Sequence, residues 1–272
     1  MSRVEVFDCH THPTFSSSIF SDVVKTNGID YSETGLLNEM KRNNVVGCVA
    51  IGFDIFSNKE VADLAEKNKN VLPVYGIMAE RLEACYANLR KNAGSGLFKG
   101  IKIYLGYEPL YPFSKKLDRF YKIAEDNNMV VIFHTGDTWH SLKKSKNGSM
   151  LKYSRPLNID EVAVAHSEMK IIIAHAGNPW IEDTAEIVYK NNNCYADISG
   201  WFIGSLNKDT IDIMKDKLKF LVRFGGKEKI LFGSDWPIAR MDDYIKMVSS
   251  CGLSSDEKKN LLYENARKLF RI

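Results

Sequence analysis

Eight short segments rich in β-branched and aromatic residues recur along the chain, and stretches with helical periodicity separate them. The segments cover residues 4–13, 45–52, 70–77, 98–106, 129–136, 170–177, 193–200 and 230–237. Residues 130–133 and 171–174 are apolar on both faces, which is typical of strands in a parallel sheet covered by helices. Eight such units in 272 residues predict one α/β domain over residues 1–272, a (β/α)₈ TIM barrel, with an open doubly wound sheet as the alternative.

Histidines and one aspartate stand where several of these strands end, which is where a barrel of this kind carries its catalytic groups. His10 and His12 end the first segment, and alternation along a strand puts them on one face, about 6.6 Å apart. The other groups at strand ends are His134, His175 and Asp235. A lone histidine at a strand end is more often a hydrogen-bonded core residue. Four of the six histidines together predict a shared site.

These residue types suit a catalytic divalent metal. Zinc in catalytic sites takes three protein ligands and keeps a position for water, and the metal lowers the pKa of that water from 15.7 to about 7. His10, His12 and His134 can supply three nitrogens. Asp235 would bind the metal or take the proton of the water, and His175 would polarise the substrate, act as general acid or bind a second metal. We therefore expect Asp235 and His175 to be catalytic.

Two further charged residues lie in the predicted strands. Lys102 stands between two isoleucines that face the other way. An ammonium in an apolar strand is costly unless it is paired or chemically changed, so Lys102 would bind an anionic substrate, be carboxylated and bridge two metals, or reach solvent from the strand end. Asp8 shares the face of His10, one strand repeat deeper. We expect it to orient an imidazole or to close the polar interior of the barrel, without touching metal.

Five sequence motifs at the predicted strand ends carry a family resemblance. They are FDCHTH at residues 7–12, KGIKI at 99–103, IFHTG at 132–136, IAHAG at 173–177 and LFGSDWP at 231–237. In this order they resemble the signature segments of the amidohydrolase superfamily, above all its amidohydrolase-related branch. The likeness continues to ENAR at residues 264–267, so it covers essentially the whole chain.

The resemblance implies a divalent metal, commonly zinc, held by His10, His12, His134 and Asp235. It makes His175 a ligand of a second metal or an acid/base. In dihydroorotase-like and phosphotriesterase-like members the lysine that matches Lys102 is carboxylated and bridges two metals, whereas one metal suffices in decarboxylase-like members. One ion, or two with a carboxylated Lys102, are both compatible with the sequence. TatD-like nucleases fit less well, because they have a glutamate in place of Lys102.

The loops past the fifth and eighth strands offer residues for substrate binding. Trp139 and Arg155 lie in the long connection over residues 137–156, and Arg240 follows Asp235. Charged runs in such loops are usually solvated surface. Arg155, Arg240 and Lys102 would nevertheless suit a carboxylate-bearing substrate if they converge over the metal. We therefore expect Trp139, Arg155 and Arg240 to contact the substrate.

The net charge and the cysteines indicate which kind of partner and which compartment to expect. The net charge is +3 and opposite charges alternate along the chain, so we expect a small-molecule substrate and no nucleic-acid or membrane surface. Five scattered cysteines without a C-x-x-C pair are typical of a reducing cytoplasm, and we expect a cytoplasmic protein. No apolar run approaches the roughly 20 residues of a membrane span. A homo-oligomer is compatible with this composition.

Three functions fit these observations. The first is a metal-dependent hydrolase that cleaves a C–N or C–O bond of a small, anionic or cyclic molecule by metal-activated water. The second is a lyase on the same scaffold, a decarboxylase or hydratase, in which Asp235 or His175 transfers the proton. The third is a metal-dependent ligand sensor without catalysis. Every expected catalytic position is filled, which favours an enzyme over a sensor.

Overall fold

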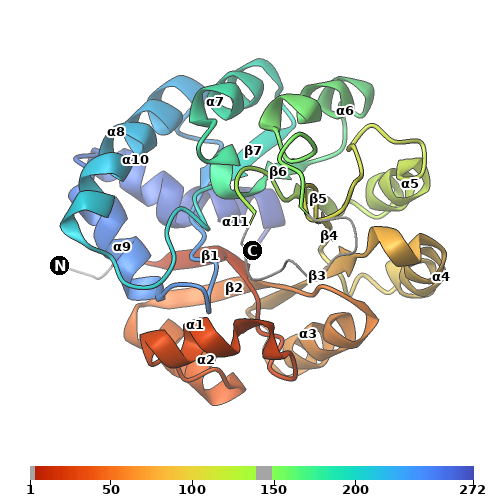
Figure 1. The fold of residues 1–272 in the computed structure, drawn as a ribbon, viewed down its shortest axis with the longest axis horizontal. Coiled ribbons are helices and arrows are strands. Elements are labelled where there is room, and N and C mark those ends of the chain that lie inside the picture. Colours follow the sequence, from red (N-terminus) through yellow and green to blue (C-terminus); the bar gives the residue numbers. More distant parts are fainter. Residues whose placement is uncertain (1–3, 139–148) are drawn as a thin grey trace.

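Eight parallel strands form a sheet in which each strand pairs with the next one along the chain (Figure 1). The computed structural model describes residues 4–138 and 149–272. Its strands are β1 (Val6–Thr11), β2 (Val45–Ile51), β3 (Val71–Ile77), β4 (Gly100–Ile103), β5 (Val130–Phe133), β6 (Ile171–Ile173), β7 (Cys194–Asp197) and β8 (Ile230–Leu231). A doubly wound sheet would reverse its strand order at a switch point, and this sheet does not. The predicted barrel is confirmed.

Helices surround the sheet and cover its outer face (Figure 1). Those up to β8 are α1 (Ser21–Asn27), α2 (Glu33–Arg42), α3 (Ile55–Lys67), α4 (Leu82–Ala93), α5 (Asp118–Asp126), α6 (Ile159–Ala165), α7 (Ile181–Lys190) and α8 (Lys208–Gly225). After β8 come α9 (Met241–Ser250), α10 (Ser255–Lys259), a π-helical turn (Asn260–Glu264) and α11 (Asn265–Phe270). The sequence did not indicate α1, which is short and polar, or α9.

The strands bury side chains on both faces, as their composition predicts. On β5, Val130 and Ile132 belong to one apolar cluster, whereas Val131 and Phe133 belong to the other. Successive side chains of a strand point to opposite faces, so the sheet separates the two clusters. Phe7 at the start of β1 contacts the ring of Phe270 in α11, with 6.1 Å between centroids. Helix α11 therefore covers the end of the barrel opposite to the carboxyl ends of the strands.

The barrel closes between β8 and β1 through a few backbone hydrogen bonds. Donors and acceptors alternate across this seam: Cys9 N to Phe232 O at 2.8 Å, Asp235 N to His10 O at 2.9 Å and His12 N to Trp236 O at 2.7 Å. The last two bonds align the end of β1 with the segment that follows β8. The seam thus fixes His10, His12 and Asp235 relative to one another.

Asp8 reinforces the seam with its buried side chain. Its carboxylate accepts from Ser234 N at 3.0 Å, from Ser234 Oγ at 2.5 Å and from His10 N at 3.1 Å. Of the two roles expected for Asp8, closure of the polar interior is the one that the structure supports. In the described part of the chain, no helix has both the length and the apolar composition of a membrane span.

We predict that Asp8→Ala lowers the free energy of unfolding by about 3 kcal/mol, because two backbone donors and one hydroxyl lose a buried acceptor. Asp8→Asn keeps one acceptor oxygen for the two backbone N–H groups and should cost no more than about 1.5 kcal/mol. Urea unfolding followed by circular dichroism measures both. Equal midpoints for Asp8→Ala and the unaltered protein would contradict this account of the seam.

Candidate active site

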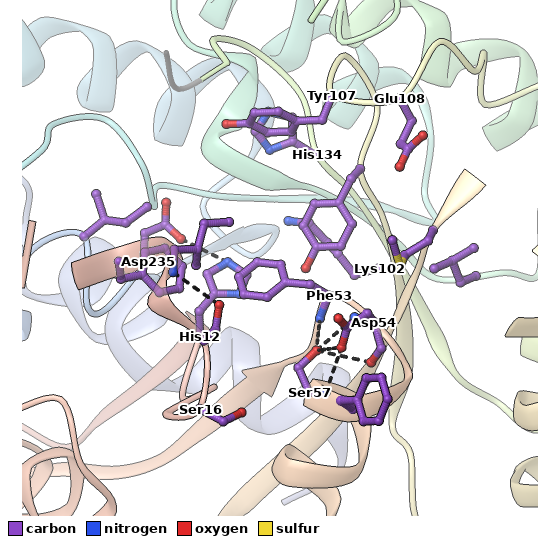
Figure 2. A pocket seen from close by; sticks show the side chains of 18 of the residues that line it. His12, Ser16, Phe53, Asp54, Ser57, Lys102, Tyr107, Glu108, His134 and Asp235 are labelled. Carbon is purple, nitrogen blue, oxygen red and sulfur yellow. Dashed lines mark hydrogen bonds and ion pairs between the residues drawn. The ribbon is translucent and has the colours of Figure 1, made fainter. Parts of the chain in front are cut away.

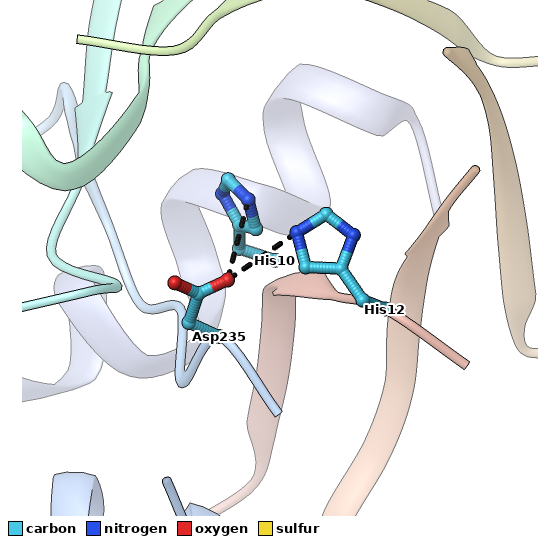
Figure 3. A group of neighbouring side chains, drawn as sticks. All are labelled: His10, His12 and Asp235. Carbon is cyan, nitrogen blue, oxygen red and sulfur yellow. Dashed lines mark ion pairs between the residues drawn. The ribbon is translucent and has the colours of Figure 1, made fainter. Parts of the chain in front are cut away.

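Three acceptor atoms face one another where the seam meets the carboxyl ends of the strands. His12 Nε2 lies 3.3 Å from Asp235 Oδ1, and His10 Nε2 lies 3.7 Å from the same oxygen (Figure 3). All three residues are buried, and their ligand atoms lie within 4.8 Å of one another. The structure thus brings together His10, His12 and Asp235, as expected from their positions at strand ends.

The hydrogen-bond partner of each Nδ1 atom decides which nitrogen of the ring carries the hydrogen. His10 Nδ1 lies 2.9 Å from Asp197 Oδ2, and His12 Nδ1 lies 3.1 Å from Ile51 O. Both partners only accept, so each Nδ1 donates and each Nε2 keeps its lone pair. Asp235 Oδ1 is buried and has no hydrogen-bond donor. A cation among these three acceptors would relieve their repulsion, and two imidazoles with a carboxylate are a donor set that zinc accepts.

By the same reasoning, His134 and His175 also present lone pairs to each other. Ser199 Oγ donates its hydrogen to Asp197 Oδ1. His175 Nδ1 lies 2.9 Å from Ser199 Oγ and must therefore donate to it. His134 Nε2 lies 3.0 Å from Asp137 O and must also donate. The remaining nitrogens, His134 Nδ1 and His175 Nε2, therefore both carry lone pairs and face each other at 3.0 Å. This pair can also bind a cation.

Burial keeps the imidazoles of His12, His134 and His175 neutral, which is the form that binds metal. It lowers the pKa of His12 and of His134, and it lowers the pKa of His175 to about 3. The pKa of Asp235 is lowered, so the carboxylate is ionised. The site therefore combines neutral nitrogen ligands with one anionic oxygen ligand.

Lys102 lies beside the first set of acceptors. It is fully buried, and its Nζ is 3.2 Å from His10 Nε2. The interpretation of a lysine that reaches solvent is therefore wrong. Burial lowers the pKa of Lys102 to about 8, so the amine loses its proton far more readily than a surface lysine does. Such an amine can bind a substrate oxygen as an ammonium or react with CO₂ as a free base.

Backbone geometry at the site is unusual at two catalytic candidates. His175 has φ of 61° and Asp235 has φ of 59°, in the left-handed region that residues other than glycine rarely adopt. Gly200, with φ of 65°, passes so close that a Cβ would lie 2.5 Å from His175 Nδ1 and 3.1 Å from Asp235 Oδ2. Only glycine fits there, beside His175 Nδ1 and Asp235 Oδ2, which lie 3.9 Å apart.

Asp197, Ser199 and Gly200 were not among the residues predicted from the sequence. Asp197 contributes most, because it accepts from His10 Nδ1 and, through Oδ1, from Ser199 and from the backbone N–H of His175. It therefore orients the ring of His10, a role that Asp8 does not take. These residues end β7 or follow it, so the rule that located the histidines would have found them at the seventh strand.

A cavity of about 570 Å³ opens above these groups (Figure 2). His12, Lys102, His134, His175 and Asp235 line its floor. Its walls are largely aromatic and include Phe20, Phe53, Tyr104 and Tyr107. The ring of Phe53 stacks on that of His12 at 4.8 Å, and Tyr104 Oη donates to Gly52 O at 2.6 Å. The cavity is suited to a flat and mainly apolar molecule.

The structure does not bring the two predicted arginines to this cavity. Arg155 donates to Asp183 at 2.8 Å and stacks on Trp180, while Arg240 donates to Asn27 O at 2.7 Å. Neither is among the described residues that line the cavity. Both guanidinium groups find partners in neighbouring elements, so the expected convergence with Lys102 does not occur.

The third predicted substrate contact, Trp139, lies outside the described residues. Of Lys102, Arg155 and Arg240, the three cations expected to converge on the substrate, Lys102 is the one that lines the cavity.

Comparisons with known proteins show the family and the fold. A family model described as Amidohydrolase matches residues 7–272. Similar solved structures include an amidohydrolase from Burkholderia multivorans with bound zinc, at 14% identity and a TM-score of 0.73 over 98% of this chain and 99% of that one. A further one is 5-carboxyvanillate decarboxylase from Sphingomonas paucimobilis, at 13% identity and a TM-score of 0.70 over 99% of both chains.

A probable 2-pyrone-4,6-dicarboxylic acid hydrolase from Acinetobacter baumannii, with citric acid bound, is also similar. It has 15% identity and a TM-score of 0.70 over 98% of this chain and 100% of that one. At these identities the structures share the fold. The family match identifies the protein as an enzyme. The chain belongs to the amidohydrolase family.

Proposed function

We propose that the protein is a metal-dependent hydrolase that cleaves a C–N or C–O bond of a small cyclic molecule. The observation that carries this proposal is the buried Asp235 Oδ1, which has no donor and faces two imidazole lone pairs at the floor of the cavity. The zinc in one similar structure and the hydrolase description of another support it.

The residues divide the work as follows. His10, His12 and Asp235 would hold one ion, for which zinc is the best candidate; His134 and His175, with a carboxylated Lys102, would hold a second. When bound, a divalent ion acidifies water and polarises a substrate oxygen. Asp235 takes the proton of the attacking water. Asp235 would then return this proton to the leaving group, while His175, whose Nδ1 already donates to Ser199, would act through Nε2.

The cavity suggests the kind of substrate. Its aromatic walls favour a flat ring, and positive charge comes from Lys102 and from the metal at the floor. A single carboxylate or carbonyl oxygen would therefore bind at the floor. The five cysteines are buried free thiols, which supports the proposed location in a reducing cytoplasm.

A lyase is the second candidate. The same cavity would hold an aromatic acid with its carboxylate against Lys102 and the metal, and one similar structure is a decarboxylase of an aromatic acid. In this reaction Asp235 or His175 would protonate the carbon that loses CO₂. The two candidates use the same residues and differ in whether water enters the product.

We predict that protein stripped with a chelator takes up at least one equivalent of Zn²⁺ or Mn²⁺. His12→Ala should raise the Kd at least about 100-fold, because loss of a ligand costs more than the about 10–100-fold lost with an outer partner. His166→Asn is the matched control, since His166 pairs with Glu125 outside the site. Elemental analysis and ion-dependent thermal shifts measure uptake. Less than about half an equivalent in the unaltered protein would contradict the proposal.

We predict that Gly200→Ala weakens metal binding and turnover by more than about tenfold, because its Cβ would displace the ring of His175 and the carboxylate of Asp235. Gly204→Ala is the control. Gly204 also has positive φ, at 81°, and lies in the same loop, but its Cβ would meet Asn27. Similar losses of metal affinity in both variants would point to backbone strain alone.

We predict that the reaction product retains every carbon of the substrate and gains one oxygen from water. Lactones, cyclic amides and aromatic acids incubated in ¹⁸O-labelled water, with mass spectrometry of the products, test this. Asp235→Asn should lower turnover by about 10³-fold if Asp235 transfers the proton. Release of CO₂ without uptake of ¹⁸O would establish the lyase instead.

A further inference from the structure

The lining of the cavity includes a carboxylate, Glu108, that does not belong to the proposed metal ligands. The floor of the cavity carries Lys102 and Asp235, and Glu108 also lines it, on the side where Figure 2 shows Tyr107. In this view Glu108 lies across the cavity from Asp235 and His12. A substrate held by an oxygen at the floor would therefore present its other end towards a carboxylate.

The position of Glu108 is fixed by a tight turn after β4. Glu108 N donates to Tyr104 O at 3.1 Å, and Leu105 and Glu108 form a parallel bridge. Gly106 turns the chain with φ of 87°, where a Cβ would lie 2.8 Å from Ser154 Cβ. One short segment thus supplies Lys102 to the floor and Glu108 to the opposite side, with aromatic Tyr104 between them in sequence.

The carboxylate of Glu108 has unused capacity to accept hydrogen bonds. Its hydrogen-bond donor is the backbone N–H of Ala79, and its neighbouring charge is Glu80. Within residues 4–138 and 149–272, no lysine, arginine or histidine forms an ion pair with it. Burial raises the pKa of Glu108, and the charge of Glu80 raises it further. A donor brought by a ligand would relieve both costs.

Asp54, another carboxylate that lines the cavity, is already in use. Its Oδ1 accepts from Ser57 N and from Ser57 Oγ, both at 2.8 Å, and so caps α3. Asp54 therefore stabilises the helix, and Glu108 is the carboxylate left for a ligand.

We propose that Glu108 determines substrate specificity by binding an ammonium or another N–H donor at the end of the substrate remote from the scissile bond. The proposal rests on the proposed function, because the floor must bind the acidic or carbonyl end. The substrate class is then a flat ring with an oxygen function at one end and an amine or amide N–H at the other. A carboxylate at the remote end would be repelled.

Three para-substituted acids test this on the full-length protein: benzoate, 4-(aminomethyl)benzoate and terephthalate. Isothermal titration calorimetry should show 4-(aminomethyl)benzoate binding about tenfold more tightly than benzoate, and terephthalate more weakly than both. Glu108→Gln should abolish this order. Glu80→Gln is the matched control, since Glu80 carries the neighbouring charge but does not line this cavity, and the order should persist.

The titrations are run on zinc-loaded and on chelator-treated protein, so that two failures can be told apart. A ranking of the three affinities that Glu108→Gln abolishes, in zinc-loaded or in chelator-treated protein, supports the inference. A benzoate affinity that is the same with and without zinc counts against the proposed metal site alone. The same order in Glu108→Gln as in the unaltered protein would overturn the inference. So would terephthalate that binds as tightly as the amine, or the failure of all three acids to bind.

Discussion

Three buried acceptor atoms held face to face are the constraint on which the site depends. His10 Nε2, His12 Nε2 and Asp235 Oδ1 would repel one another in isolation. They stay together because each is fixed from behind: two by hydrogen bonds to their Nδ1 atoms, and the third by the backbone bond from Asp235 N to His10 O. The free energy of folding thus offsets a repulsion that a bound cation would remove. Such preorganisation is typical of metal sites.

Asp197 connects this set of acceptors to the pair formed by His134 and His175. One carboxylate oxygen orients His10, and the other receives Ser199 and the backbone of His175. The directions of the hydrogen bonds at His10 Nδ1 and, through Ser199, at His175 Nδ1 follow from this one acceptor. A change of charge at either set therefore reaches the other through a single buried carboxylate.

The sequence predicted the fold and the inner residues of the site well, because both depend on local patterns. Strand and helix periodicities specify the barrel, and strand ends locate the histidines and Asp235. The arginines were misplaced for the opposite reason. Arg155 and Arg240 are held by Asp183 and by Asn27 O, partners that only the tertiary structure brings near. The burial of Lys102 and the proton positions on the rings also depend on neighbours distant in the sequence, as does the role of Asp197.

The seam between β8 and β1 has a consequence for the order of events during synthesis. His10 and His12 leave the ribosome more than two hundred residues before Asp235. An amino-terminal fragment therefore presents only two imidazoles on one strand, which bind an ion weakly and without selection. The complete donor set forms only when the last strand docks. A metal held by these residues would therefore be selected only after the barrel has closed, when the folded geometry can discriminate among ions.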